Sequence, residues 1–389
     1  MDWRITQRAQ KISSSAIREI LKVTERPEVI SFAGGLPSPA TFPVEHIRAA
    51  CADVLAREPA AALQYAPTEG YAPLREWVAA QCVRKGAQVS AAQVLITTGS
   101  QQALDLIAKT VVEKDRDMLM ETPTYLGALQ AFSLYEPRFV AVPCDDAGPI
   151  VPELAGLAGG RASGLYLLPN FQNPSGRRIP EARRRALVDV CRDRDLLIIE
   201  DDPYGELSYG GDILPTLHSM NAAGVIYTGS FSKLLSPGLR VGYLVAPDAL
   251  FRKLVQVKQS ADLHTPSFTQ RIVYQVIKDG FLDQHIPQIR ALYAGQCQVM
   301  LEALAAHFPP TARWTAPAGG MFIWVTLPAH IDSTLLLEKA IARNVAFVPG
   351  APFFLADPQA NTLRLSFVTV PPERIRAGVK VLGELIADA

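Results

Sequence analysis

The stretch Val225-Ile226-Tyr227-Thr228-Gly229-Ser230-Phe231-Ser232-Lys233 is an apolar run that ends in two serines and a lysine, and Arg240 follows seven residues later. A lysine at the end of a buried strand is costly unless its charge is removed or paired. An imine bond to an aldehyde cofactor uses the amine covalently and removes that cost. Two hydroxyls and an arginine beside it are suited to holding a phosphate. The stretch therefore favours pyridoxal 5'-phosphate attached to Lys233. The expected phosphate ligands are Ser230, Ser232 and Arg240.

Outward from this stretch, apolar strand-like runs alternate with helix-like segments between about residues 94 and 247. Near-continuous apolar strands separated by amphipathic helices predict an α/β fold, a mostly parallel central sheet with helices on both faces. The expected strands lie at residues 94–98, 117–121, 164–168, 195–200 and 224–228. A further strand at residues 240–246 follows Lys233 too closely for a crossover helix. We expect it to be antiparallel to its predecessor and to bring Arg240 beside Lys233.

The pattern changes towards the C-terminus, where short strands lie between helices. A helix is expected over residues 288–307, and strands are expected at residues 320–325, 345–348 and 362–366. This order predicts a smaller α+β domain, and 389 residues exceed one ordinary core. We expect an N-terminal helix and arm over residues 1–45, a large cofactor-binding domain over 46–285 and a small C-terminal domain over 286–389.

Polar side chains follow the expected strands at their carboxyl ends, where an open parallel sheet binds its ligands. Ser100 and Gln101 open a helix after the first strand, and the free amides of a helix start suit a phosphate. Asp201 follows the fourth strand and can keep a pyridine nitrogen protonated, which makes the ring an electron sink. Asn173 and Tyr204 can donate hydrogen bonds to the phenolate oxygen of that ring. Tyr125 can stack on the ring face.

Each of these motifs alone also has a purely structural interpretation. Gly99-Ser100 can be a helix cap, residues 200–202 a solvated acidic loop, Arg364 an ordinary ion pair and Tyr125 a core residue. Their convergence on one edge of the sheet favours a common site. The six histidines show no metal-ligand spacing, so we expect no metal.

Composition narrows the function further. The chain has 38 basic and 38 acidic residues, a net charge of 0, and nothing that favours nucleic acid or an acidic membrane. Its five cysteines are scattered, which argues against a disulfide scaffold and agrees with a reducing compartment. The sequence has no apolar run long enough to cross a bilayer and begins without the apolar core of a signal peptide. We therefore expect a cytoplasmic enzyme that binds neither nucleic acid nor membrane.

Several motifs together carry a family resemblance over nearly the whole chain. They include Ser-Phe-Ala-Gly-Gly-Leu-Pro at residues 31–37, Thr-Gly-Ser-Gln-Gln at 98–102, Asn-Pro-Ser-Gly at 173–176, Gly-Ser-Phe-Ser-Lys at 229–233 and Asn-Thr-Leu-Arg-Leu-Ser at 361–366. With these motifs the chain resembles the class I/II, fold-type I pyridoxal-phosphate aminotransferases. Within them it is similar to the branch of bacterial 2-aminoadipate aminotransferases and mammalian kynurenine aminotransferase II.

The resemblance implies a role for each candidate residue at the cofactor. Lys233 would carry the cofactor and shuttle the proton, Asp201 would pair with the pyridine nitrogen, and Tyr125 would stack on the ring. Asn173 and Tyr204 would contact the ring hydroxyl. The phosphate ligands would be Ser100, Gln101, Ser230, Ser232 and Arg240. A tyrosine matching Tyr65 reaches the phosphate of the partner subunit in this family, which implies a homodimer.

The resemblance also implies how substrates bind. Arg364 would clamp the α-carboxylate, with Asn173 and Gly35 beside it, and Arg18 would contact the distal carboxylate of aminoadipate or glutamate. The expected reaction moves an amino group by a ping-pong mechanism between an L-amino acid and 2-oxoglutarate or glutamate. The amino acid would be 2-aminoadipate, an aromatic or a branched or apolar one.

Two alternatives stay open from the sequence. The first is a lyase, decarboxylase or racemase on the same scaffold, since a fold does not fix the reaction. The second is a non-catalytic regulator of the same superfamily, which carries an N-terminal winged helix. We expect the roughly thirty residues before the first strand-like segment to be too short for such a domain, and the neutral charge agrees.

Overall fold

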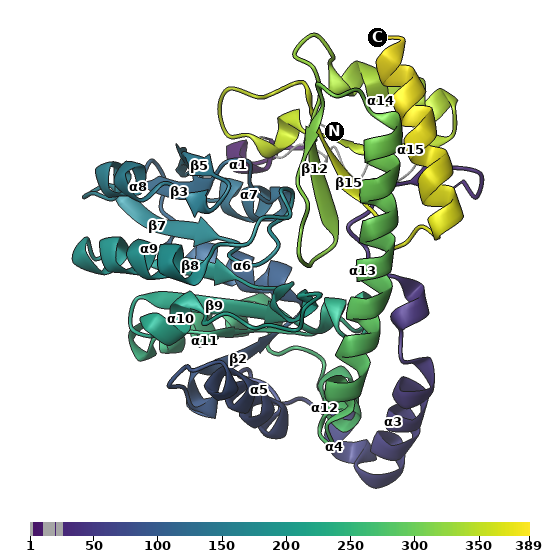
Figure 1. Ribbon diagram of the computed structural model, residues 1–389. Helices are drawn as coiled ribbons and strands as arrows, with labels where there is room; N and C mark the ends of the chain where they lie inside the picture. Colours follow the sequence, from purple (N-terminus) through teal and green to yellow (C-terminus); the bar gives the residue numbers. More distant parts are fainter. Residues whose placement is uncertain (1–2, 11–19, 21–25) are drawn as a thin grey trace.

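A mostly parallel sheet forms the centre of the computed structural model, which describes residues 3–10, 20 and 26–389 (Figure 1). Within these residues the sheet has seven strands in the order β2-β10-β9-β8-β7-β3-β4. Their bounds are β2 (Val94–Thr97), β3 (Asp117–Glu121), β4 (Arg138–Val142), β7 (Ala162–Leu167), β8 (Ile198–Asp201), β9 (Val225–Ser230) and β10 (Gly242–Val245). β10 is antiparallel to β9, as predicted, and it is also antiparallel to β2; the other neighbours are parallel. The edge strand β4 is one that the sequence pattern did not single out.

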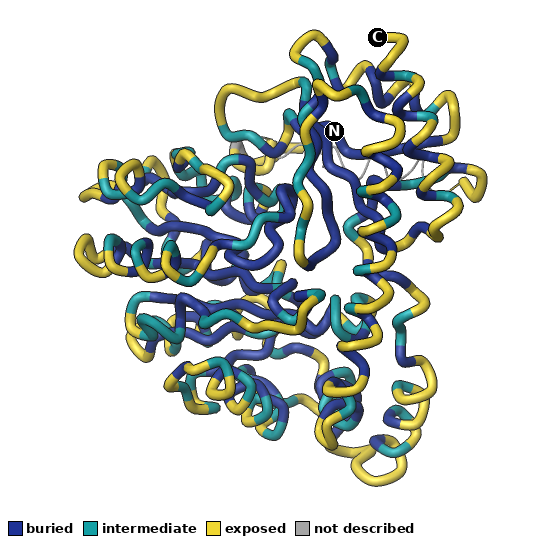
Figure 2. Tube along the Cα trace, viewed as in Figure 1, coloured by how far each residue is buried: buried dark blue, intermediate teal, exposed yellow. Residues whose placement is uncertain are grey.

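Successive side chains of a strand point to opposite faces of the sheet. Because apolar side chains lie on both faces of this sheet, helices cover both faces. In β3, Met118 and Met120 join a core that includes Leu104. Leu119 between them joins a separate core with Leu154 and Leu187. The first core is covered by α6 (Ser100–Val111), α7 (Leu126–Ser133) and α11 (Asp248–Asp262). The second is covered by α8 (Val151–Leu157), α9 (Glu181–Asp193) and α10 (Leu217–Met220). Figure 2 shows the strands buried between helices whose outer faces are exposed.

A third group of helices packs at the β2 end of the sheet. It comprises α3 (Val44–Arg57), α4 (Pro59–Leu63), α5 (Ala72–Arg84) and α12 (Ser267–Ile277). Leu74 and Val78 of α5 pack with Val94 and Ile96 of β2 in one apolar core. Three short elements also precede the C-terminal part of the chain, namely α1 (Gln7–Gln10), β5 (Cys144–Asp145) and β6 (Gly148–Pro149).

The C-terminal part forms a smaller α+β layer, as the sequence predicts. Its antiparallel sheet has the order β11-β12-β15-β14, with β11 (Arg313–Trp314), β12 (Phe322–Thr326), β15 (Thr362–Ser366) and β14 (Val348–Pro349). Helices α13 (Phe281–His307), α14 (Ser333–Ala342) and α15 (Pro372–Ala387) pack around it. The N-terminal strand β1 (Ile30–Ser31) joins this part by pairing in parallel with β13 (Val345–Ala346).

The long helix α13 connects the two parts of the molecule. Figure 1 shows it running from α12 at one end to α15 at the other. It begins at Phe281 rather than at residue 288, with Pro287 inside it. A proline removes only one donor from a helix, and the helix is held by packing along its length. The boundary proposed at residues 285/286 falls inside α13, and the division into domains stays a proposal. None of the helices in the described part of the chain is long and apolar enough to cross a membrane.

Candidate active site

A cavity of about 500 Å³ lies at the carboxyl ends of β7, β8 and β9. It brings together every candidate residue of the sequence except Arg18 and Tyr65. The candidates that line it are Gly35, Ser100, Gln101, Tyr125, Asn173, Asp201, Tyr204, Ser230, Ser232, Lys233, Arg240 and Arg364. Leu36, Leu168, Pro203 and Pro237 complete the lining. An apolar side chain carries no chemical signal in the sequence, so only the fold shows that these four residues line the cavity.

Lys233 lies in the short turn Phe231–Lys233 that directly follows β9. The Ser230 hydroxyl accepts a hydrogen bond from the Ser232 amide at 3.1 Å and so caps this turn. The Lys233 ammonium donates to the Gly35 carbonyl at 2.8 Å. Burial, and then the positive charges of Arg364 and Arg240, lower the pKa of Lys233 to about 8. An amine with that pKa is far more reactive near neutral pH than an ordinary lysine.

Asp201 ends β8 and is buried, with both carboxylate oxygens bound. The Tyr166 hydroxyl donates to Oδ2 at 2.8 Å, and the Thr228 hydroxyl donates to Oδ1 at 2.8 Å. Burial raises the pKa of Asp201 to about 6, although these two hydrogen bonds act in the opposite direction. Sequence reasoning missed Tyr166 and Thr228 as functional residues. A hydroxyl within each of two apolar strands that flank β8 is the signal that could have found them.

The start of α6 and Arg240 form one wall of the cavity. Gly99, with φ 77°, turns the chain from β2 into α6, so that the first amides of the helix face the cavity. Arg240, with φ 51°, donates from Nη2 to the Thr98 carbonyl at 3.3 Å. A Cβ on Gly99 would lie 2.5 Å from Nη2 of Arg240, so only glycine leaves room for the guanidinium. A helix start with an arginine beside it forms a suitable phosphate site.

Arg364 of β15 reaches the cavity from the smaller, four-stranded sheet and is 1% exposed. Its Nη1 donates to Asn173 Oδ1 at 2.8 Å, and its Nη2 donates to the Ala33 carbonyl at 2.6 Å. Its guanidinium carbon lies 4.4 Å from the centroid of the Phe322 ring. Burial lowers the pKa of Arg364 to about 10. Its buried Nε has no hydrogen-bond partner within the described residues, and each Nη carries a second hydrogen besides the one used in these bonds, which leaves donors for a carboxylate ligand.

Two tyrosines line the cavity, of which Tyr204 is buried and Tyr125 is partly buried. Burial raises the pKa of Tyr125 to about 12 and raises that of Tyr204 further. The Tyr204 ring meets Phe322 edge to face, with centroids 5.9 Å apart. Both phenols therefore stay protonated near neutral pH and can donate hydrogen bonds.

The structure does not bring Tyr65 into this cavity. Tyr65 is 78% exposed, and its ring meets His264 edge to face with centroids 5.8 Å apart. Arg18 lies outside the described residues. No group of three or more histidine, cysteine or acidic side chains suited to a metal occurs in the described ranges.

The residues present fit pyridoxal phosphate. A partly buried lysine, a buried carboxylate held by two hydroxyls, and the start of α6 beside Arg240 line one cavity. Together with the sheet order, they define a pyridoxal-phosphate enzyme of fold type I. Residues 27–382 match the family model for aminotransferase class I and II. The chain belongs to this family and is a pyridoxal-phosphate-dependent aminotransferase. The fold, the cofactor and the enzyme class expected from the sequence are confirmed.

Individual relatives agree along almost their full length. The chain is 46% identical to a 2-aminoadipate transaminase of Thermus thermophilus, covering 97% of this chain and 95% of that one. It is 44% identical to aromatic-amino-acid aminotransferase 1 of Thermococcus litoralis, covering 98% and 94%. A crystal structure of the α-aminoadipate aminotransferase LysN from Thermus thermophilus, complexed with N-(5'-phosphopyridoxyl)-L-leucine, superposes with a TM-score of 0.92. That structure is 44% identical and the match covers 99% and 97% of the two chains.

Proposed function

We propose that this aminotransferase moves an amino group between 2-aminoadipate, or an aromatic or branched apolar L-amino acid, and 2-oxoglutarate or glutamate. The observation that carries the proposal is Arg364, a buried arginine that lines the same cavity as Lys233. This geometry supports binding of an α-carboxylate next to a reactive amine. The names of the relatives support the choice of side chains, since one acts on 2-aminoadipate, one on aromatic amino acids, and one structure carries a leucine adduct.

Each residue of the cavity has a separate task in this proposal. When bound, pyridoxal phosphate supplies an aldehyde for the amino group and a ring that accepts electrons. Lys233 Nζ takes the proton from the substrate α-carbon and returns it, because its lowered pKa suits a general base. Asp201, oriented by Tyr166 and Thr228, holds the proton on the ring nitrogen.

The remaining residues orient the two ligands. Asn173 and Tyr204 would donate to the ring oxygen, and Tyr125 would stack on the ring. The phosphate would be held by Ser100, Gln101, Ser230, Ser232 and Arg240. Arg364 binds the α-carboxylate with Asn173 and Gly35 beside it, so the reacting carbon lies near Lys233.

A single pocket that serves both half-reactions makes a ping-pong mechanism the natural one. Such a pocket must accept an acidic side chain in one half-reaction and an apolar one in the other. A fixed, buried arginine would reject the apolar partner, because its charge would be left unpaired. We propose that Arg18 contacts the distal carboxylate of the acidic substrates only and withdraws from the pocket when the side chain is apolar.

The most direct experiment follows the loss of cofactor absorbance with each candidate amino donor in single half-reactions. We expect rapid conversion with glutamate, 2-aminoadipate and at least one aromatic or branched apolar donor. Conversion with none of these, or release of ammonia or carbon dioxide without a requirement for an oxo acid, would contradict the proposal.

The Arg18→Ala variant separates the two substrate classes. We expect kcat/KM to fall only for glutamate, 2-oxoglutarate and aminoadipate. The fall should correspond to a loss of about 2–3 kcal/mol of transition-state stabilisation, as expected for one charge-assisted bond. An equal loss for apolar donors, or no loss for the acidic substrates, would exclude this role for Arg18.

We also propose a homodimer with the active site at the subunit interface. Leu36 lines the cavity and is 56% exposed, and the near neighbours in sequence Leu63 and Tyr65, at the end of α4, are 72% and 78% exposed. Large apolar side chains that are exposed together, as Leu63 and Tyr65 are, favour an interface. In this arrangement Tyr65 would reach the phosphate of the partner subunit.

A further inference from the structure

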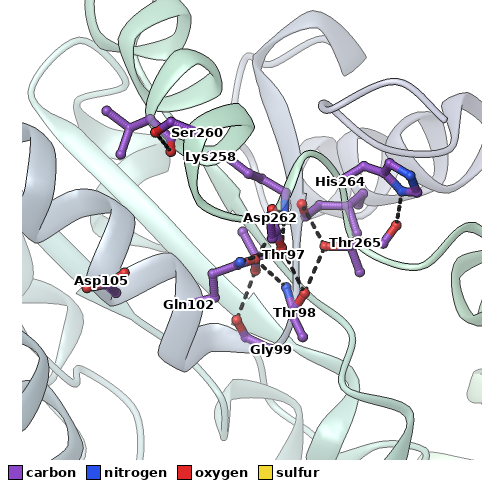
Figure 3. A network of polar contacts seen from close by, with 12 residues as sticks. Thr97, Thr98, Gly99, Gln102, Asp105, Lys258, Ser260, Asp262, His264 and Thr265 are labelled. Carbon is purple, nitrogen blue, oxygen red and sulfur yellow. Dashed lines mark hydrogen bonds and ion pairs between the residues drawn. The ribbon is translucent and has the colours of Figure 1, made fainter. Parts of the chain in front are cut away.

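An ion pair between a buried lysine and a partly exposed aspartate lies next to the turn that opens α6 (Figure 3). Neither residue lines the cavity. The Lys258 side chain of α11 is fully buried, and its Nζ donates to Asp262 Oδ1 at 2.8 Å and Oδ2 at 2.9 Å. The same Nζ donates to Gln102 Oε1 of α6 at 3.0 Å. Gln102 Nε2 in turn donates to Asp262 Oδ2 at 2.6 Å. We refer to these three residues as the Lys258 cluster.

The Lys258 cluster holds Thr98, the residue between β2 and Gly99. The Thr98 amide donates to Gln102 Oε1 at 2.8 Å. Its hydroxyl lies 3.4 Å from Asp262 Oδ2 and 3.2 Å from the Thr265 hydroxyl. Its carbonyl accepts the hydrogen bond from Arg240. Every polar group of Thr98 is therefore engaged, and two of the three contact the Lys258 cluster.

Thr98 is positioned to transmit this restraint to the phosphate site. The next residue, Gly99, has a positive φ and the freedom of a glycine, so the turn does not fix itself. Ser100 and Gln101, whose amides begin α6, follow directly. Because Arg240 also binds Thr98, a displacement of Thr98 would move the helix start and the guanidinium together.

The backbone after α11 supports a precise placement of Asp262. Leu263 has φ 62° and ψ −61°, and the His264 amide donates to the Asp262 carbonyl at 2.7 Å, which makes a strained γ-turn. A leucine adopts this conformation at a cost, and such strain persists where the surrounding contacts determine it. The turn brings Thr265 back to Thr98.

Charge gives the Lys258 cluster a second effect at the phosphate site. Asp262 places a carboxylate within hydrogen-bonding distance of Thr98, close to where we place a phosphate dianion. An unpaired carboxylate there would repel the phosphate, and Lys258 neutralises it. Burial of the Lys258 ammonium is costly unless it is paired, so its place beside this turn calls for a role other than stability.

We propose that Lys258 and Asp262 are positioning residues for the cofactor phosphate, which act through Gln102 and Thr98 on the amides of α6 and on Arg240. The proposal rests on the assignment of Ser100, Gln101 and Arg240 to the phosphate. We expect the Lys258 cluster to affect binding of the cofactor phosphate and not binding of the cofactor ring or of the substrate.

The test compares two aldehydes that differ only in the phosphate. Full-length protein freed of cofactor is titrated with pyridoxal phosphate and, separately, with pyridoxal, and each Kd is measured by absorbance. Lys258→Met should weaken pyridoxal phosphate about tenfold and change the Kd of pyridoxal less than about twofold. At saturating cofactor, the KM for the amino donor should stay as in the unchanged protein. Equal weakening of both aldehydes, or of neither, would overturn the proposal.

A matched control breaks a similar lysine–aspartate pair that lies on α6 itself. Lys109 donates to Asp105 at 2.6 Å with the same four-residue spacing, but this pair is half-exposed and one to two turns further along the helix. Lys109→Met should leave both Kd values unchanged. If it selectively weakened pyridoxal phosphate, the effect of Lys258→Met would be a general one of helix charge, and the proposal would fail.

Two further variants keep the test decisive. If Lys258→Met does not fold, Gln102→Leu removes the link to Thr98 at nearly constant volume. This variant should weaken the binding of pyridoxal phosphate several-fold and leave the binding of pyridoxal unchanged. The absence of such a selective loss would overturn the proposal. Arg240→Met tests the underlying assignment. Arg240→Met could weaken pyridoxal phosphate selectively while Lys258→Met and Gln102→Leu do not. That result would exclude the positioning role of the Lys258 cluster and would keep the assignment of Arg240 to the phosphate. No selectivity with Arg240→Met would show that the phosphate lies elsewhere.

Discussion

At the scale of single residues, the chemistry of this protein depends on charges that are buried without full pairing. Burial, and then the charges of Arg364 and Arg240, lower the pKa of Lys233, while Asp201 is kept in place by two neutral hydroxyls. Perturbed titratable groups that share one cavity are characteristic of active sites. The identities of these residues are readable in the sequence, but their pKa shifts are not, because burial and neighbouring charge come from the fold.

The pKa of Lys233 predicts how cofactor uptake depends on pH. Only the neutral amine can attack an aldehyde, and lowering the pKa from 10.5 to about 8 raises the neutral share at a given pH. At pH 7 that share is roughly one tenth instead of roughly one part in three thousand. The rate of pyridoxal phosphate uptake, followed by stopped-flow absorbance, should therefore rise with pH and level off above about 8. A rise that continues to pH 10 would show that Lys233 titrates as an ordinary lysine.

At the scale of the elements, the turn between β2 and α6 determines the phosphate site. The sequence predicts a strand, a Gly-Ser turn and a helix start here, and the structure has β2 ending at Thr97 and α6 starting at Ser100. The Lys258 cluster that packs behind the turn draws two of its residues from α11, far later in the chain than β2. No local pattern reveals such a contact, since it depends on how two helices pack.

Gly99→Ala should therefore weaken cofactor binding as well as stability. The positive φ costs about 1 kcal/mol for a residue with a Cβ, and the new methyl group would displace the Arg240 guanidinium. Urea unfolding and a titration with pyridoxal phosphate measure the two effects. The control is Gly86→Ala, which has φ 89° but whose Cβ would meet only Ser219 at 3.9 Å. Equal weakening of cofactor binding in both variants would contradict the role of Gly99.

The edges of the predicted elements show where local patterns end. The strand at residues 362–366 and the antiparallel strand after Lys233 agree with the structure. The predicted start of α13 lies seven residues too late, because Pro287 reads as a helix start although the structure accommodates it inside the helix. The edge strand β4 is partly exposed, and its pairing with β3 is a long-range contact that its own pattern does not specify.

At the scale of the whole molecule, one cavity lies between two parts of the chain. Arg364 enters it from the smaller, four-stranded sheet, whereas Lys233 and Asp201 come from the large sheet. The sequence identifies these three residues because each sits in a distinctive motif. It does not place the residues that support them, such as Tyr166 and Phe322, since an apolar or aromatic residue in a buried strand reads as core. The roles of Tyr65 and Arg18 remain predictions about the assembled, substrate-bound protein.

The proposed dimer predicts a specific effect of Tyr65→Phe. Loss of one phosphate hydrogen bond from the partner subunit should weaken cofactor retention, while the free energy of unfolding changes by less than about 1 kcal/mol. Retention is measured by dialysis and sedimentation gives the assembly state. Tyr135→Phe is the control, since it also removes one phenolic bond, to Asp105 at 2.8 Å, from a residue that does not line the cavity. A fully active monomer would contradict the proposed interface.

The central claim is that Lys233 carries the cofactor, and one measurement tests it most directly. Sodium borohydride fixes pyridoxal phosphate irreversibly to the lysine that holds it, and mass spectrometry of a protease digest then locates the label. The account predicts the label on the peptide that contains Lys233, and no incorporation in Lys233→Ala. Two other well-buried lysines, Lys85 and Lys258, are the internal comparison, because each is already engaged in an ion pair. A label on either of these in the unchanged protein, or full labelling of Lys233→Ala, would contradict the account.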